Sequence, residues 1–292
     1  MNPFGDILTA MATALHEDGS VNYEGTAELA EYLAEHGSDG LVVTGTTGES
    51  PTLTDDEKVR LFETVVEAAG GRASIIAGTG SNDTAHSVEL TRRAAEAGVD
   101  GILAVTPYYN KPPVAGVVAH FQAVAAACEL PVVLYNIPGR TALNMEPETL
   151  AALSETANIV AVKQANPDLE QSRRLTGLCD LGLYAGNDDM LYPLLEYGAW
   201  GGICVASHLA GAEMKQMVEL YRAGSREEAA AIDESLTPLY EALSVTTNPI
   251  PIKAALNMLG HNVGGLRLPL VPATEAEEAR IREVLQARTL IG

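Results

Sequence analysis

A single lysine ends an apolar stretch of the sequence. Lys163 follows residues 159–162 in the run NIVAVKQANPD, where a buried strand would continue with an aliphatic residue. A lysine is a nucleophile only as the neutral amine, and an apolar environment disfavours its charged form. A neutral amine can attack a ketone to form an imine, which makes the adjacent carbon acidic. The residue predicts carbanion chemistry without a metal or a cofactor, although a strand-end lysine that reaches solvent is an equally simple explanation.

Hydroxyl and cationic side chains follow other apolar runs. Tyr135 ends such a run in VVLYNIPGRT, and Thr46 in GTTGES and Tyr109 in TPYYNKP could join its phenol in a proton relay. The small residues of GTTGES let backbone N–H groups approach a carboxylate, with Thr46 and Thr47 as further donors. As a loop it is equally typical of a turn that caps the next helix. Arg140 presents a planar fork for a second carboxylate, or forms an ordinary surface ion pair.

The elements that must position these residues alternate between short β-branched runs and longer amphipathic segments. Eight βα units predict a closed parallel barrel, in which the C-terminal ends of the strands meet at one mouth. An open doubly wound sheet is the alternative, but no GxGxxG motif follows the first strand. The predicted strands are 7–13, 41–43, 74–78, 101–105, 132–136, 159–163, 183–185 and 201–205.

The strand pattern stops after residue 225. The sequence therefore predicts an α/β fold with two parts: a (β/α)8 TIM barrel over residues 1–225, which carries the catalytic residues, and a small C-terminal helical domain over residues 226–292.

Composition narrows the possible partners. The 292 residues include 39 acids and 18 bases, a net charge of −21 that disfavours nucleic acid and anionic membranes. Only five bases are lysines, which favours a halophilic origin somewhat over an acidic mesophilic protein. The N-terminal stretch has no basic leader before its apolar residues, so we expect a cytoplasmic protein.

Metal chemistry is disfavoured by the histidines and cysteines. The six histidines and three cysteines are scattered singly, with no spacing typical of zinc ligands and no CxxC pair. A metal-dependent barrel hydrolase would need clustered ligands at the strand ends, so we expect no metal.

The motifs together resemble a known family. GTTGES, TPYYNKP, YNIPGRT, the VK of the sixth strand, AGNDD and NPIPIKAAL…LRLPLVP occur in order between about Gly5 and Pro272. This set resembles the dihydrodipicolinate synthase family of pyruvate-dependent class I lyases and aldolases. The resemblance implies that pyruvate, as an imine, condenses with L-aspartate 4-semialdehyde to give 4-hydroxy-tetrahydrodipicolinate, on the diaminopimelate route to lysine. It also implies a homotetramer built as a dimer of tight dimers, with no cofactor.

The resemblance assigns roles to particular residues. Lys163 forms the imine, and Tyr135 relays protons with Thr46 and with Tyr109, which reaches into a neighbouring subunit. The residues implied to bind substrate are Thr46 and Thr47 for the pyruvate carboxylate, Arg140 for the semialdehyde at the entrance, and Gly186 and Ile203 as pocket lining.

The sequence also departs from the family pattern. Gln164 stands where the family commonly has glutamate after the lysine. Many relatives bind lysine as a feedback inhibitor in a second cleft; here His86 takes the place of an acid there, and Asp55 and Lys58 take the places of histidines. We therefore expect lysine inhibition in its usual form to be lost.

Two other functions remain open from the residues. A 2-keto-3-deoxygluconate-type aldolase would share Lys163, Tyr135 and the threonine loop, but a neutral polyol aldehyde would leave Arg140 unpaired. A barrel that only binds a 2-oxo acid is the second alternative, and it would not require the lysine and tyrosine together.

Overall fold

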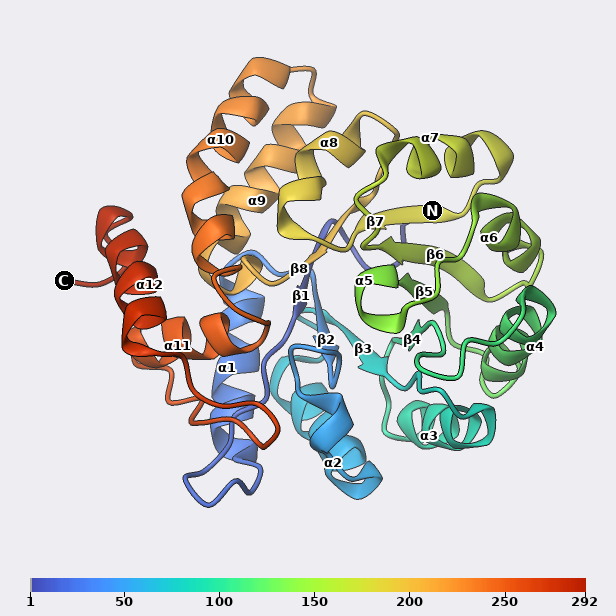
Figure 1. The fold of residues 1–292 in the computed structure, drawn as a ribbon, viewed down its shortest axis with the longest axis horizontal. Helices are drawn as coiled ribbons and strands as arrows, with labels where there is room; N and C mark the ends of the chain where they lie inside the picture. Colours follow the sequence, from blue (N-terminus) through green and yellow to red (C-terminus); the bar gives the residue numbers. More distant parts are fainter. Residues whose placement is uncertain (1) are drawn as a thin grey trace.

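Eight parallel strands form a closed barrel in the computed structural model, which describes residues 2–292 (Figure 1). Each strand pairs with the next along the chain, and β8 returns to pair with β1. This closure confirms the barrel prediction and shows that the doubly wound alternative is wrong, since such a sheet keeps two open edges. The strands are β1 Ile7–Ala10, β2 Gly40–Val43, β3 Ser74–Gly78, β4 Gly101–Val105, β5 Val132–Asn136, β6 Ile159–Gln164, β7 Gly182–Ala185 and β8 Gly201–Cys204.

Helices surround the barrel, and their ends follow the sequence signals. Thr54 and Glu57 form a capping box at the start of α2, and Asp83 caps α3. The α-helices are α1 Tyr23–Glu35, α2 Asp55–Ala69, α3 Thr84–Glu96, α4 Val114–Ala125, α5 Pro138–Thr141, α6 Pro147–Ser154, α7 Leu169–Leu178, α8 Leu191–Leu195, α9 Ser207–Arg222, α10 Arg226–Ala242, α11 Ile250–Met258 and α12 Glu275–Ala287. Two 3₁₀ turns, η1 Ser50–Thr52 and η2 Asp188–Met190, follow β2 and β7.

The core has two layers because alternate strand residues point to opposite faces. One large apolar cluster lies between the strands and the helices. A smaller cluster fills the barrel interior, and Tyr135 belongs to it. Its other buried members include Leu8, Ala10, Val42, Ile76, Leu103, Val133, Ala161, Tyr184 and Ile203. The interior is therefore packed below the level of Tyr135, and the open space lies above it.

Strands β1 and β8 end earlier than the sequence predicts. Residues 11–13 are apolar or β-branched, but β1 stops at Ala10, because the Ala12 N–H donates to the His208 imidazole at 3.1 Å. Strand β8 stops at Cys204, because the N–H groups of Val205 and Ala206 donate to the Asp188 carboxylate. In both places side chains distant in sequence replace the neighbouring strand as hydrogen-bond partners.

The last part of the chain is helical. After Cys204 no strand occurs in residues 205–292, all of which the structure describes. Helices α10, α11 and α12 lie on one side of the barrel, where α10 packs against α9 (Figure 1). A domain boundary near residue 225 stays a prediction. Within residues 2–292, no helix has the length and apolar character needed to cross a bilayer.

The buried His208 predicts a loss of stability in acid. It accepts the Ala12 N–H at Nε2 and donates from Nδ1 to the Val205 carbonyl at 2.8 Å, and burial lowers the pKa of His208 from 6.5 to about 4. Between these values the unfolded chain binds the proton more readily, so stability is complete above about pH 6.5 and falls as the pH drops. We expect this residue to remove about 2 kcal/mol of unfolding free energy between pH 7.5 and pH 5.

Urea unfolding of the wild type and His208→Gln at the two pH values measures this effect. Glutamine can keep both hydrogen bonds but does not titrate, so the pH dependence should shrink by about that amount. His16→Gln, at an exposed position, is the matched control and should behave as the wild type. An unchanged pH dependence in His208→Gln would contradict the assignment.

Candidate active site

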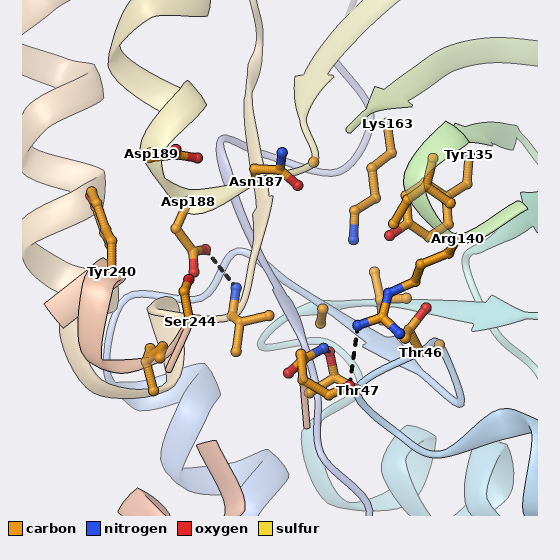
Figure 2. A pocket seen from close by; sticks show the side chains of 18 of the residues that line it. Thr46, Thr47, Tyr135, Arg140, Lys163, Asn187, Asp188, Asp189, Tyr240 and Ser244 are labelled. Atoms are coloured by element: carbon orange, nitrogen blue, oxygen red, sulfur yellow. Dashed lines mark hydrogen bonds between the residues drawn. The ribbon is translucent and has the colours of Figure 1, made fainter. Parts of the chain in front are cut away.

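Lys163 and Tyr135 lie side by side at the C-terminal ends of β6 and β5. The strand register pairs the two residues directly, and the Lys163 Nζ lies 4.4 Å from the centroid of the Tyr135 ring. Each residue is only 5% exposed. Figure 2 shows the Lys163 amine pointing into the pocket, with the Tyr135 hydroxyl on the side that faces it. Among residues 2–292 the amine has no hydrogen-bond or ion-pair partner, so it is free to act on a ligand.

The loop after β2 lines the same cavity as the Lys163 amine. Its backbone is strained: Thr44, a β-branched residue, has φ of +55°, and Glu49 has φ of +57°. A Cβ on Gly78 would lie 2.6 Å from the Thr44 carbonyl oxygen, so the loop can approach β3 only because that position is glycine. Within the described chain, the N–H groups of Thr46 and Thr47 have no acceptor. This leaves backbone and hydroxyl donors for an anion.

A segment from the C-terminal part of the chain completes the mouth. Asn248, just before α11, donates from Nδ2 to the Thr47 hydroxyl oxygen at 3.0 Å. Its backbone carbonyl accepts from Arg140 at 3.2 Å, and Thr247 lies 3.4 Å from the same guanidinium nitrogen. In Figure 2 the Arg140 guanidinium extends across the pocket toward Thr47. One backbone segment therefore holds both the threonine loop and the arginine.

The side chains enclose a cavity of about 640 Å³. Thr46, Thr47, Tyr135, Arg140 and Lys163 all line it, as the sequence predicts. Its other polar lining residues are Asn187, Asp188, Asp189, Asp233, Thr237, Tyr240, Glu241, Ser244 and Asn248. A cavity of this size holds a small keto acid and a second small substrate together.

Three other predicted site residues lie in different surroundings. Gly186 lines the cavity, and a Cβ there would come within 2.7 Å of Ala165, so a larger residue would not fit. Ile203 is fully buried in the barrel interior and does not line the cavity, so its contact with substrate stays a prediction. Tyr109 is 88% exposed with φ of +73° and does not line the cavity of its own chain.

The sequence did not identify the contributions of η2 and α10–α11. Burial raises the pKa of Asp188, and its carboxylate holds the chain after β8 through the N–H groups of Val205 and Ala206. Burial likewise raises the pKa of the Cys204 thiol well above its usual value, which keeps it neutral. The motifs AGNDD and NPIPIK marked these segments, but nothing in their spacing indicated a role for Asp188 or Asn248.

A second cavity of about 560 Å³ adjoins the first along Thr46, Tyr135 and Arg140. Its lining includes Asp55, Lys58, Asn82, His86 and Tyr108. The Asp55 carboxylate lies 2.9 Å from His86 Nε2 and 3.4 Å from Lys58 Nζ. The Asp55 carboxylate is therefore already paired with protein groups. The loss of lysine inhibition in its usual form stays a prediction.

No metal site stands out in the part of the chain that the structure describes: His, Cys, Asp and Glu do not gather there in groups of three or more.

The comparisons with known proteins agree with one another. The model of the dihydrodipicolinate synthetase family matches residues 3–288. The 4-hydroxy-tetrahydrodipicolinate synthase of Heliobacterium modesticaldum is 52% identical over 286 residues, which cover 97% of this chain and 95% of that protein. The crystal structure of the DHDPS from Cyanidioschyzon merolae, with lysine bound, superposes with a TM-score of 0.97 at 46% identity and covers 99% of both chains. The chloride-inhibited dihydrodipicolinate synthase from Acinetobacter baumannii, complexed with pyruvate, gives a TM-score of 0.95 at 36% identity over 99% of this chain and 100% of that one.

Proposed function

Since the chain belongs to the dihydrodipicolinate synthetase family, we propose that Lys163 carries its 4-hydroxy-tetrahydrodipicolinate synthase reaction as an imine with pyruvate. The protein is an enzyme, a lyase of lysine and diaminopimelate biosynthesis built on a TIM barrel. One observation supports the role of Lys163 most strongly: its amine is buried, has no hydrogen-bond or ion-pair partner among residues 2–292, and lies 4.4 Å from the Tyr135 ring.

The proposed reaction uses the site residues in order. The Lys163 amine attacks the ketone carbon of pyruvate, and water leaves to give a protonated imine. The methyl carbon then loses a proton to form an enamine, which attacks the aldehyde carbon of L-aspartate 4-semialdehyde and regenerates the lysine imine. The amino group of the semialdehyde then attacks the imine carbon, which closes the ring of the product and expels the Lys163 amine. Tyr135 moves the protons of these steps with Thr46, because its hydroxyl is on the side that faces the lysine.

The carboxylates of the two substrates have separate partners in this proposal. The pyruvate carboxylate accepts from the free N–H groups and hydroxyls of Thr46 and Thr47. Arg140 receives the carboxylate of the semialdehyde, because its guanidinium lies at the border of the two cavities. Gly186 lines the pyruvate position, and Ile203 supports it from the buried barrel interior.

Tyr109 serves the active site of a partner subunit in this proposal. A tyrosine that is 88% exposed at a backbone φ of +73° is costly unless a contact covers it. A dimer at least is required, and the homotetramer of the family is the expected assembly. The cytoplasmic location and a preference for high salt stay predictions.

The two alternative functions that the same barrel fold could serve are less well supported. A 2-keto-3-deoxygluconate-type aldolase leaves Arg140 without a carboxylate, and a barrel that only binds a 2-oxo acid has no use for an unpartnered lysine beside a phenol. The relative of about half identity carries the synthase name over the full length of the chain.

Borohydride reduction in the presence of pyruvate tests the proposal directly. Reduction traps the imine as a stable secondary amine, and peptide mass mapping then locates the modified lysine. We expect a single pyruvyl adduct, on the peptide that contains Lys163. The other four lysines serve as internal controls, because Lys58 and Lys253 are also buried but are paired with carboxylates. An unmodified Lys163 peptide in active enzyme would rule the proposal out.

A further inference from the structure

A buried ion pair joins the threonine loop to the C-terminal part of the chain. Lys253 on α11 places its Nζ 2.8 Å from Glu49 Oε1, and the two side chains are 2% and 1% exposed. Glu49 comes two residues after Thr47 in GTTGES. A buried ion pair seldom adds net stability, because removing two charges from water costs about as much as their attraction returns. Because Glu49 belongs to the threonine loop, the ion pair suggests a role in substrate binding.

The same glutamate has a second partner. Its Oε2 accepts the backbone N–H of Arg267 at 3.0 Å, so both carboxylate oxygens are held by residues more than 200 positions away. Five residues before Lys253 on the chain, Asn248 donates to the Thr47 hydroxyl oxygen. Since that oxygen already accepts from Asn248, the Thr47 hydroxyl hydrogen is free to point at a ligand.

We propose that Lys253 is a positioning residue for pyruvate: through the ion pair it neutralises the buried charge of Glu49 in the loop that carries Thr46 and Thr47. This inference rests on the proposed function. If Lys253 were absent, Glu49 would leave a buried negative charge two residues from Thr47 and would repel the pyruvate carboxylate. If both charges were absent, no repulsion would remain. Loss of Lys253 alone should therefore weaken pyruvate binding, whereas loss of the Glu49 charge should not.

Steady-state kinetics at pH 8 with varied pyruvate test this asymmetry. For Lys253→Met we expect the KM for pyruvate to rise by about ten-fold or more, with kcat within about three-fold of wild type. For Glu49→Gln and for the double variant Glu49→Gln/Lys253→Met we expect a KM within about three-fold of wild type. Lys253→Gln keeps a donor for Glu49 but removes the charge, and should behave like Lys253→Met.

Glu213→Gln is the matched control. Glu213 on α9 pairs with Arg288 at 2.6 Å, which also joins the C-terminal part of the chain to the barrel but does not involve the threonine loop. Its KM for pyruvate should not change. A KM that rises equally in Glu49→Gln and Lys253→Met, or stays high in the double variant, would overturn the proposal. So would the failure of both Lys253→Met and Lys253→Gln to fold, since the pair would then act on stability. Borohydride trapping in the wild type decides the function separately.

Discussion

Replacing Lys163 with alanine is expected to lower kcat/KM by at least about 10⁴-fold, because no other group can form the imine. The amine is the only part of the site whose loss removes a covalent step and not merely a stabilising contact. The residual rate would come from the threonine loop and Arg140, which still bind the two carboxylates. Thermal unfolding should show little change in stability, because the amine has no hydrogen-bond or ion-pair partner in residues 2–292 and contacts only the Tyr135 ring. The coupled assay of product formation with purified variant measures the loss.

Lys163→Arg separates covalent from electrostatic catalysis. Arginine places a permanent positive charge next to the Tyr135 ring, but its guanidinium stays protonated and cannot attack a ketone. We expect it to be as inactive as Lys163→Ala. Activity above about one per cent in Lys163→Arg, with Lys163→Ala inactive, would mean that charge, and not an imine, supports the reaction; activity at that level in both variants would mean that Lys163 is not required.

The sequence was sufficient to place Tyr135 and Lys163 side by side. Strand period 2 and the βα alternation put Tyr135 and Lys163 at the ends of adjacent strands, and the observed register pairs them directly. The predicted bounds of β3, β4 and β5 match the structure. These predictions succeed because they depend on local pattern and on one fold-level rule, that parallel barrel strands end at a common mouth.

The sequence was not sufficient where contacts join distant residues. Strand β1 looked longer because residues 11–13 are apolar, but the Ala12 N–H is bound by His208, 196 positions away. The contacts of Lys253 with Glu49 and of Asn248 with Thr47 span 204 and 201 positions. A lysine and an asparagine in a helical segment read as surface residues unless the packing of that segment is known. The C-terminal contribution to the site therefore needed the structure.

Replacing Arg140 with alanine is expected to separate the two substrates. We expect kcat/KM for L-aspartate 4-semialdehyde to fall by about 10²- to 10³-fold, the value of a bidentate, charge-assisted pair with a carboxylate. The rate of borohydride trapping with pyruvate should stay within about three-fold of wild type, because Lys163, Thr46 and Thr47 are unchanged. Steady-state assays with the semialdehyde varied measure the first quantity, and the time course of borohydride trapping with pyruvate alone measures the second.

The design of the Arg140 experiment must allow for its contact with the C-terminal segment. Arg140 also donates to the Asn248 carbonyl, and Asn248 in turn donates to Thr47. If alanine loosened that segment, pyruvate binding would weaken together with semialdehyde binding, and equal losses for both substrates would contradict the role proposed for Arg140. Arg140→Lys is the matched variant: it keeps the charge but loses the planar fork, so an intermediate loss for the semialdehyde alone is expected. A graded loss that leaves pyruvate trapping constant would identify Arg140 as the carboxylate partner of the second substrate.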